Sequence, residues 1–322
     1  MSRLTWTACR SILNGVVGDY LSERQNGLAI DMAFYHAGQP LALTPAGLGA
    51  VYPNLTGKLC VLVHGLGCHE GVWAFRPTEP DPEDVSYGTL LQAECGYTPF
   101  YLRYNTGLHI SQNGRRLARL LGQLLDSYPR LVEEIVLIGH SMGGLVLRSA
   151  CHYGTEEGTA WTARVTRVIY LGTPHDGAYL ERLGHATAAI LQAIPHPVTR
   201  LVGRIGNLRS QGIQDLRYGS LVDEDWADGV TAIGHDPREP IPWLAPARHY
   251  LAVGTLADDP ESAVNALLGD ALVWASHAHG PAWRSQGKHA DDHARRFPQV
   301  HHLALARHPD VYEQIKLWCT ED

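Results

Sequence analysis

The sequence predicts an α/β fold with a mostly parallel central sheet, and three observations predict it. Short apolar runs typical of buried strands alternate with amphipathic runs at helical spacing along most of the chain. Several of these runs end in glycine-rich turns, where a strand can pass directly into a helix. The 322 residues can bury a full core, and a content of 45% hydrophobic and 18% charged residues is that of a globular protein.

The strands are expected where apolar residues run continuously between turn residues. These segments are 58–63, 98–104, 134–138, 167–171, 249–255 and 300–305. The first is almost entirely apolar, as a strand buried on both faces of a sheet should be. Helices are expected between and after the strands, at 111–128, 143–153 and 309–319, and Pro129 marks the end of the first of these helices.

Two regions depart from this alternation of strands and helices. The pattern of residues 1–50 predicts a short helix at the amino terminus, a turn at Asn26-Gly27 and a loop that continues to Asn54. Residues 177–246 contain short amphipathic stretches, many Pro and Gly residues and no strong strand. This pattern predicts an inserted helical cap within a single domain that spans residues 1–322.

Charge, cysteine content and hydropathy exclude several classes of protein. With 26 basic and 33 acidic residues, the net charge of −7 provides no basic field that would attract nucleic acid. Six scattered cysteines without a Cys-x-x-Cys spacing exclude a disulfide-dense mini-domain. No apolar run is as long as a membrane span. The first ten residues contain no secretory signal, which predicts a cytoplasmic location, or a secreted one if a leader has been removed.

The strongest chemical motif is Gly139-His140-Ser141-Met142-Gly143, between a predicted strand and a predicted helix. A Gly-x-Ser-x-Gly sequence in this context predicts a nucleophile elbow, a strand-to-helix turn so tight that small residues must flank the serine. Ser141 is therefore the candidate nucleophile. The backbone N–H of Met142, at the start of the following helix, is a candidate oxyanion donor.

A second glycine-rich turn, His64-Gly65-Leu66-Gly67, follows the first predicted strand. A hydrolase needs a second oxyanion donor from this early loop, and the N–H of Leu66 is the candidate. The base and the acid should follow the serine in the chain, in the order acid and then histidine. Spacing favours Asp258 or Asp259 as the acid, with Asp270 and Asp228 as alternatives. It leaves His301, His302 and His308 open as the base.

Five segments resemble the lipase branch of the α/β-hydrolases, near the bacterial lipases and the inositol-deacylase-like (PGAP1-like) esterases. The segments are His64-Gly65-Leu66-Gly67, Gly139-His140-Ser141-Met142-Gly143-Gly144, Leu171-Gly172-Thr173-Pro174-His175-Asp176-Gly177, Gly269-Asp270-Ala271-Leu272-Val273 and His302-Leu303-Ala304-Leu305. The resemblance implies an α/β-hydrolase fold. It also implies that Asp270 is the acid and His302 is the base.

The chain departs from the family pattern at two of these segments. Ala271 replaces a glycine, and Ala304 stands where calcium-binding relatives carry an aspartate ligand, so no calcium is expected there. The patch of His277, His279, His289 and His293 is interpreted as a surface loop rather than a zinc site, and no metal or cofactor is predicted.

The residues together predict a serine ester hydrolase, either a lipase or a carboxylesterase, that cleaves hydrophobic acyl esters through an acyl-enzyme on Ser141. The predicted substrate-binding residues are His64, His140, His175, Leu180 and Leu183. An apolar cap would hold the acyl chain and would allow transient contact with a lipid interface. The alternatives are an acyltransferase with the same triad and a non-catalytic binding module of the same fold.

Overall fold

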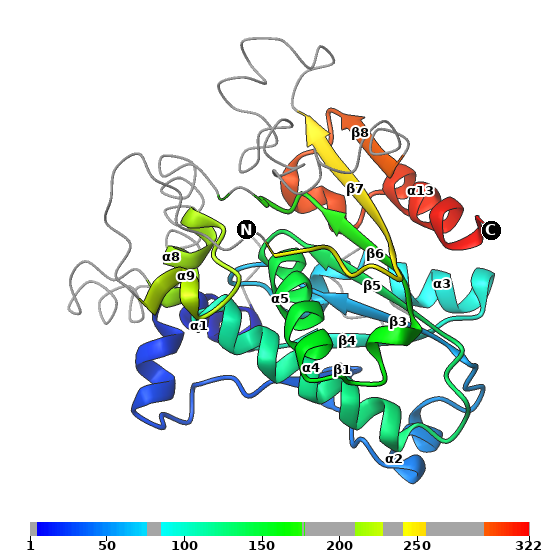
Figure 1. Ribbon diagram of the computed structural model, residues 1–322, viewed down its shortest axis with the longest axis horizontal. Coiled ribbons are helices and arrows are strands. Elements are labelled where there is room, and N and C mark those ends of the chain that lie inside the picture. The colour runs from blue at the N-terminus through cyan, green and yellow to red at the C-terminus, as the bar shows by residue number, and fades with distance from the viewer. Residues whose placement is uncertain are drawn as a thin grey trace.

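The computed structural model describes residues 5–75, 85–175, 177, 210–227, 241–255 and 293–321. At the centre of the described residues is an eight-stranded sheet with the order β2-β1-β4-β3-β5-β6-β7-β8 (Figure 1). Its strands are β1 Ala33–His36, β2 Gln39–Pro40, β3 Lys58–Val63, β4 Thr98–Arg103, β5 Glu134–His140, β6 Val165–Leu171, β7 Arg248–Thr255 and β8 Ala294–Pro298.

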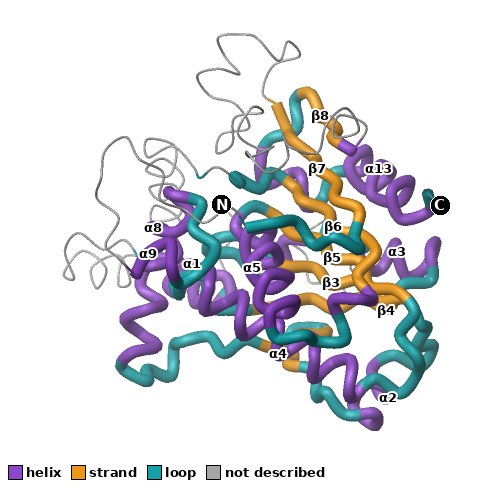
Figure 2. Tube along the Cα trace, viewed as in Figure 1, coloured by secondary structure: helices purple, strands orange, loops and turns teal. Residues whose placement is uncertain are grey.

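The six strands from β4 to β8 in this order run parallel, and the β1–β2 hairpin joins antiparallel at the β4 edge. The carboxyl ends of the parallel strands therefore meet along one edge of the sheet, which is where open α/β sheets bind ligands. Figure 2 shows these strands as one layer between helices. The prediction of a mostly parallel sheet is confirmed.

Helices cover both faces of the sheet. They are α1 Trp6–Glu23, α2 Pro45–Val51, α3 Tyr87–Cys95, α4 Ile110–Ser127, α5 Met142–Glu156, α8 Gln211–Tyr218, α9 Glu224–Ala227 and α13 Pro309–Thr320, with short 3-10 helices at Glu70–Trp73, Thr162–Arg164 and His302–Ala306. The helices α4 and α5 pack side by side over one face (Figure 1). The helices α3 and α13 pack together on the opposite face.

Strand β3 is apolar at nearly every position because its side chains enter a hydrophobic core on each face of the sheet. Leu59, Val61 and Val63 belong to the core on the face of α4 and α5, whereas Cys60 and Leu62 belong to the core on the face of α3 and α13. Successive side chains of a strand point to opposite faces, so a strand that is covered on both faces cannot alternate apolar with polar residues.

The strand predicted at 300–305 is wrong. The last strand of the sheet is β8, Ala294–Pro298, and residues 302–306 form a 3-10 helix. In this edge strand Phe297 is buried, but Arg295 and Arg296 are exposed. Because only one side chain of this edge strand is buried, its sequence lacks the continuous apolar run by which a strand is recognised.

The amino-terminal region is more regular than its sequence predicts. The expected short helical start is the 18-residue helix α1, and the expected loop contains α2 and the β1–β2 hairpin. Ala37 and Gly38 connect the two strands, and both have positive φ angles, of 47° and 75°. Such a pair is typical of a two-residue hairpin turn of type I′.

The predicted cap at 177–246 lies largely outside the described residues, and its described parts include α8 and α9. The division into one domain with an inserted cap therefore stays a prediction. Among the described residues, no helix is both long and apolar enough to cross a membrane. All six cysteines are described, and all have free thiols.

Candidate active site

Ser141 occupies a strained turn between the last residue of β5 and the first residue of α5. Its backbone has a φ of 56° and a ψ of −126°, and a positive φ is uncommon for a residue with a side chain. The Ser141 N–H donates to the Leu171 carbonyl at 2.8 Å, and its carbonyl accepts from the Gly144 N–H at 3.0 Å. The turn therefore has the backbone of a nucleophile elbow.

Close backbone contacts explain the glycines that flank Ser141. A Cβ atom at Gly143 would lie 2.2 Å from the carbonyl oxygen of Val63, which belongs to the neighbouring strand β3. A Cβ atom at Gly139 would lie 2.6 Å from the Cα of Gly144. Real Cβ atoms do not approach other atoms so closely, so both positions require glycine.

The loop after β3 passes directly beside Ser141. A Cβ atom at Gly65 would lie 2.9 Å from the Cβ of Ser141. The Cys68 N–H donates to the Gly65 carbonyl at 3.2 Å and closes a four-residue turn, in which Gly67 has a positive φ of 68°. The structure thus brings the two glycine-rich motifs of the sequence together.

Two backbone N–H groups near Ser141 are available for a ligand. Met142 is the first residue of α5, where a helix leaves its N–H groups without a partner, and the Ser141 side chain does not cap them. In the loop after β3, the Gly67 N–H donates to the Thr106 hydroxyl and the Cys68 N–H donates to the Gly65 carbonyl. Within the described part of the chain, no acceptor takes up the Leu66 N–H.

His302 is the first residue of the 3-10 helix that follows β8, and only 4% of the residue's surface is exposed. The Nε2 atom of His140 is 3.0 Å from the carbonyl oxygen of His302, and the rings of these two residues lie 4.9 Å apart. Gly172, at the end of β6, makes room for the His302 ring, because a Cβ atom there would lie 2.9 Å from the His302 Nδ1 atom. His302 is therefore next to the residue that precedes Ser141.

The two other histidine candidates for the base have different surroundings. His301 is exposed. His308 is the N-cap residue of α13, and its Nδ1 atom accepts from the Asp310 N–H at 3.3 Å. These positions favour His302 among the three histidines that the sequence left open.

The rings of His64 and His140 are fully buried and carry no charge near neutral pH. Burial lowers the pKa of His64 to about 4 and the pKa of His140 to about 3. His64 stacks on Tyr104 with a centroid distance of 4.6 Å. Both histidines therefore support the loops around Ser141 from within, and their contact with a substrate stays a prediction.

His175 lies four residues after the end of β6 and is buried. Its ring meets Tyr170 edge to face at 4.8 Å and Trp243 at 5.1 Å. These contacts join the segment after β6 to residues 241–247. Through these contacts His175 braces the segment after β6, and its contact with a substrate stays a prediction.

Several predicted site residues lie outside the described residues. They are Asp270, Leu180, Leu183 and the alternative acids Asp228, Asp258 and Asp259. The assignment of the acid and of the apolar cap residues therefore stays a prediction. Sequence analysis missed Thr106 and Tyr104, which contact the loop after β3, and it gave no role to Gly172, which makes room for His302. Their position just after β4 and β6, at the carboxyl edge of the sheet, is the signal that could have found them.

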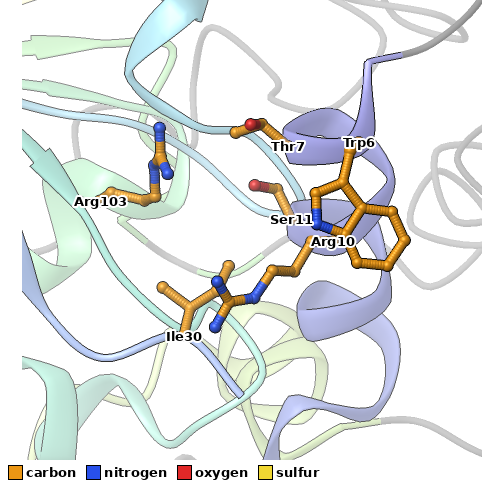
Figure 3. A pocket seen from close by; sticks show the side chains of 6 residues that line it. All are labelled: Trp6, Thr7, Arg10, Ser11, Ile30 and Arg103. Carbon is orange, nitrogen blue, oxygen red and sulfur yellow. The ribbon is translucent and has the colours of Figure 1, made fainter. Parts of the chain in front are cut away.

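A small cavity of about 40 Å³ lies between α1 and the end of β4 (Figure 3). It is lined by Trp6, Thr7, Arg10, Ser11, Ile30 and Arg103. The Arg10 guanidinium donates to backbone carbonyls of residues 27–29, and the Arg103 guanidinium pairs with Glu70. The walls of this cavity contain none of the residues that the sequence assigns to the active site.

Residues 105–231 match the family of PGAP1-like alpha/beta domains, a segment that includes Ser141 but is less than half of the chain. A search of curated protein sequences found no match. Among solved structures, the chain is similar to a lipase of Bacillus licheniformis in its mature form, with 18% identity, coverage of 82% of this chain and 92% of the lipase, and a TM-score of 0.50.

Two further structures are similar at lower scores. One is an esterase of Pyrococcus furiosus, with 13% identity, coverage of 82% of this chain and 81% of the esterase, and a TM-score of 0.46. The other is lipase B of Aspergillus fumigatus, with 11% identity, coverage of 82% of this chain and 53% of the lipase, and a TM-score of 0.45.

The likeness to the Bacillus lipase extends over most of both chains and therefore concerns the whole fold. The parallel sheet and the strand-to-helix turn with a positive φ at Ser141 are features of the same fold class. The chain accordingly has the α/β-hydrolase fold, with a PGAP1-like segment at residues 105–231.

Proposed function

We propose that the protein is a serine carboxylic-ester hydrolase of the lipase or carboxylesterase type. One observation carries this proposal: Ser141 has a positive φ in a strand-to-helix turn and contacts the Gly65 loop, while His302 lies against the preceding residue. A serine in a strained strand-to-helix turn, beside backbone N–H donors and a histidine, is the arrangement that acyl transfer needs.

The proposed reaction begins with attack of the Ser141 Oγ atom on the ester carbonyl carbon. His302 takes the serine proton and then donates it to the leaving alcohol. The N–H groups of Leu66 and Met142 stabilise the negative charge on the carbonyl oxygen in the tetrahedral intermediate. Water then attacks the acyl carbon while His302 takes its proton. The bond to the Ser141 Oγ atom breaks, His302 returns the proton to that oxygen, and the carboxylic acid leaves.

Asp270 is the proposed acid of the triad, on the resemblance of its segment to the lipases. It would orient the His302 ring and stabilise the imidazolium that forms during the reaction. An acyl substrate of apolar character is supported by Leu303, which follows His302 and has 48% of its surface exposed.

The test is hydrolysis of p-nitrophenyl esters, from acetate to palmitate, by the wild-type protein and by Ser141→Ala. The variant should lose at least about 10³-fold in kcat/KM, because removal of a nucleophile abolishes the acyl-enzyme route. Ser127→Ala, at the end of α4, is the matched control and should keep full activity. A fluorophosphonate should label the wild-type protein on the peptide that contains Ser141 and should not label Ser141→Ala.

The outcomes separate the alternatives. Labelling without hydrolysis, together with ester formation when an alcohol acceptor is added, would indicate an acyltransferase. A wild-type protein that neither reacts with the probe nor hydrolyses any ester would refute the proposal and would favour a non-catalytic binding module.

A further inference from the structure

Two side chains that follow β4 hold the loop that contains Leu66. The Thr106 Oγ1 atom accepts a hydrogen bond from the Gly67 N–H at 3.0 Å. The Tyr104 hydroxyl donates to the His64 carbonyl at 2.8 Å, and the Tyr104 ring stacks on the His64 ring. Both Thr106 and Tyr104 are 1% exposed; the bond from Tyr104 is buried, and the bond to Thr106 is partly buried.

The peptide group between Gly65 and Leu66 lies between these two hydrogen bonds, and its orientation follows from the groups around it. The His64 carbonyl is fixed by Tyr104, and the Gly67 N–H is fixed by Thr106. Between them, the Gly65 carbonyl accepts from the Cys68 N–H. Because a peptide group is planar, the Leu66 N–H must point away from the Gly65 carbonyl, so its direction is also fixed.

Thr106 is itself held by the helices around it. The Asn105 side chain donates to the Gly18 carbonyl of α1 at 2.8 Å, and the Asn113 side chain of α4 donates to the Asn105 carbonyl at 3.0 Å. Both hydrogen bonds are buried. They hold Asn105, the residue before Thr106, against helices α1 and α4.

Helices α1 and α8 also pack closely against this part of the chain. A Cβ atom at Gly15 of α1 would lie 3.0 Å from the Gly67 Cα and 3.4 Å from the Thr106 Oγ1. A Cβ atom at Gly212 of α8 would lie 2.1 Å from the Thr106 carbonyl oxygen, and the Gly212 N–H donates to the Gly107 carbonyl. The Thr106 hydroxyl thus has little freedom to move relative to Gly67.

We propose that Thr106 is a positioning residue for ester hydrolysis: its hydroxyl, with that of Tyr104, presets the Leu66 N–H to meet the oxyanion of the transition state. This inference rests on the proposed function. Donors that are oriented before the reaction stabilise developing charge without reorganising, and small displacements of such groups reduce rates strongly. Thr106 touches neither the substrate nor the reacting atoms.

The experiment compares Thr106→Val with Thr106→Ser on a p-nitrophenyl ester and on its thionoester. Valine has the shape of threonine but leaves the Gly67 N–H without an acceptor, whereas serine keeps the oxygen. We expect Thr106→Val to lose about 10- to 100-fold in kcat with KM changed by less than about threefold. Thr106→Ser should stay within about threefold of the wild-type protein.

The thionoester separates a positioning role from a general structural role. Sulfur is a weak hydrogen-bond acceptor, so the thionoester gains little from oxyanion donors. In Thr106→Val the rate ratio of ester to thionoester should therefore fall, whereas a loss from general loosening of the fold would reduce both rates equally and would overturn the inference. Thr155→Val, which removes a hydroxyl bond within α5, is the control and should keep the wild-type ratio.

A second variant covers the case in which Thr106→Val does not fold. Tyr104→Phe removes the hydroxyl that holds the His64 carbonyl, keeps the ring, and should reduce the ester to thionoester ratio in the same direction. Unchanged ratios in all folded variants of Thr106 and Tyr104, with an active wild-type protein that depends on Ser141, would refute the positioning role alone. An inactive wild-type protein would refute the proposed function and this inference together.

Discussion

His140 donates a hydrogen bond to the backbone of His302. The distance from the His140 Nε2 atom to the His302 carbonyl oxygen is 3.0 Å. Burial lowers the pKa of His140 to about 3, so its imidazole is neutral near pH 7 and must carry its proton on the nitrogen that faces a carbonyl. The residue that precedes Ser141 therefore anchors the backbone of the proposed base.

This bond predicts that His140→Leu lowers kcat/KM for ester hydrolysis by about tenfold or more, because the His302 ring is then less well placed. His140→Gln can donate from a similar position and should retain more activity than the leucine variant. Steady-state hydrolysis of one p-nitrophenyl ester measures both. His152→Gln, on the far part of α5, is the control, and a fully active His140→Leu would show that the bond does not position His302.

The contact between Gly65 and Ser141 predicts a strong effect of one added methyl group. In Gly65→Ala the new Cβ atom would lie 2.9 Å from the Ser141 Cβ and 3.3 Å from the His140 Nδ1, so the elbow or the loop must move. We expect kcat/KM to fall by about 100-fold or more. Activity is compared with thermal unfolding of the same sample.

Gly122→Ala is the matched control for Gly65→Ala. A Cβ atom at Gly122 meets nothing within 4 Å, and the residue lies inside helix α4. This variant should keep full activity and gain about 0.5 to 1 kcal/mol in the free energy of unfolding, because alanine is the better helix former. Equal activities of the two glycine variants would contradict the crowding at Ser141.

Much of the sheet and the centre of the site could be predicted because their physical constraints are local. A strand buried on both faces carries a continuous apolar run, which reveals β3 and the apolar parts of β5 and β6 in the sequence. The elbow at Ser141 also has a local signature, since glycine is required on both sides of the turn.

The elements that sequence analysis missed depend on contacts between distant residues. Strand β8 is held by pairing with β7, and its exposed arginines conceal it. Thr106 acts through one hydroxyl bond to Gly67, 39 residues earlier in the chain, and such a bond leaves no periodic pattern. The neighbourhood of His302 could not be derived from spacing either, because it forms when the ends of β5, β6 and β8 meet.

A buried pair between α4 and α8 should contribute strongly to stability. The Asp215 carboxylate accepts from the His109 Nδ1 at 3.0 Å and from the Ile110 N–H at 2.7 Å, and His109 stacks on Trp226 at 4.0 Å. Asp215→Ala leaves both donors buried without an acceptor and should reduce the free energy of unfolding by about 3 kcal/mol. Urea unfolding at pH 7 measures this change.

The exposed pair of Asp223 and Arg115 provides the comparison for Asp215. Both side chains have 36% of their surface accessible, so solvent screens their attraction. Asp223→Ala should cost at most about 1 kcal/mol. If Asp215→Ala were no more destabilising than Asp223→Ala, the buried pair would not anchor α8 to the start of α4.

Buried neutral histidines predict that the protein loses stability in mild acid. Burial lowers the pKa of His249 to about 4, from an ordinary value of 6.5, and its ring contacts the Tyr170 hydroxyl and the Leu244 carbonyl. Between pH 6.5 and about 4 the unfolded chain binds more protons at this site than the folded chain. The free energy of unfolding must therefore fall as the pH falls through this window.

Each such histidine can contribute a slope of at most about 1.4 kcal/mol per pH unit, and His64 and His140 should add to it. His249→Gln should make the decrease shallower, because glutamine does not titrate. His301→Gln changes an exposed side chain and should leave the slope as in the wild-type protein. Urea unfolding at pH 7, 6, 5 and 4 gives the slopes, and equal slopes for His249→Gln and the wild-type protein would show that His249 is not held neutral by the fold.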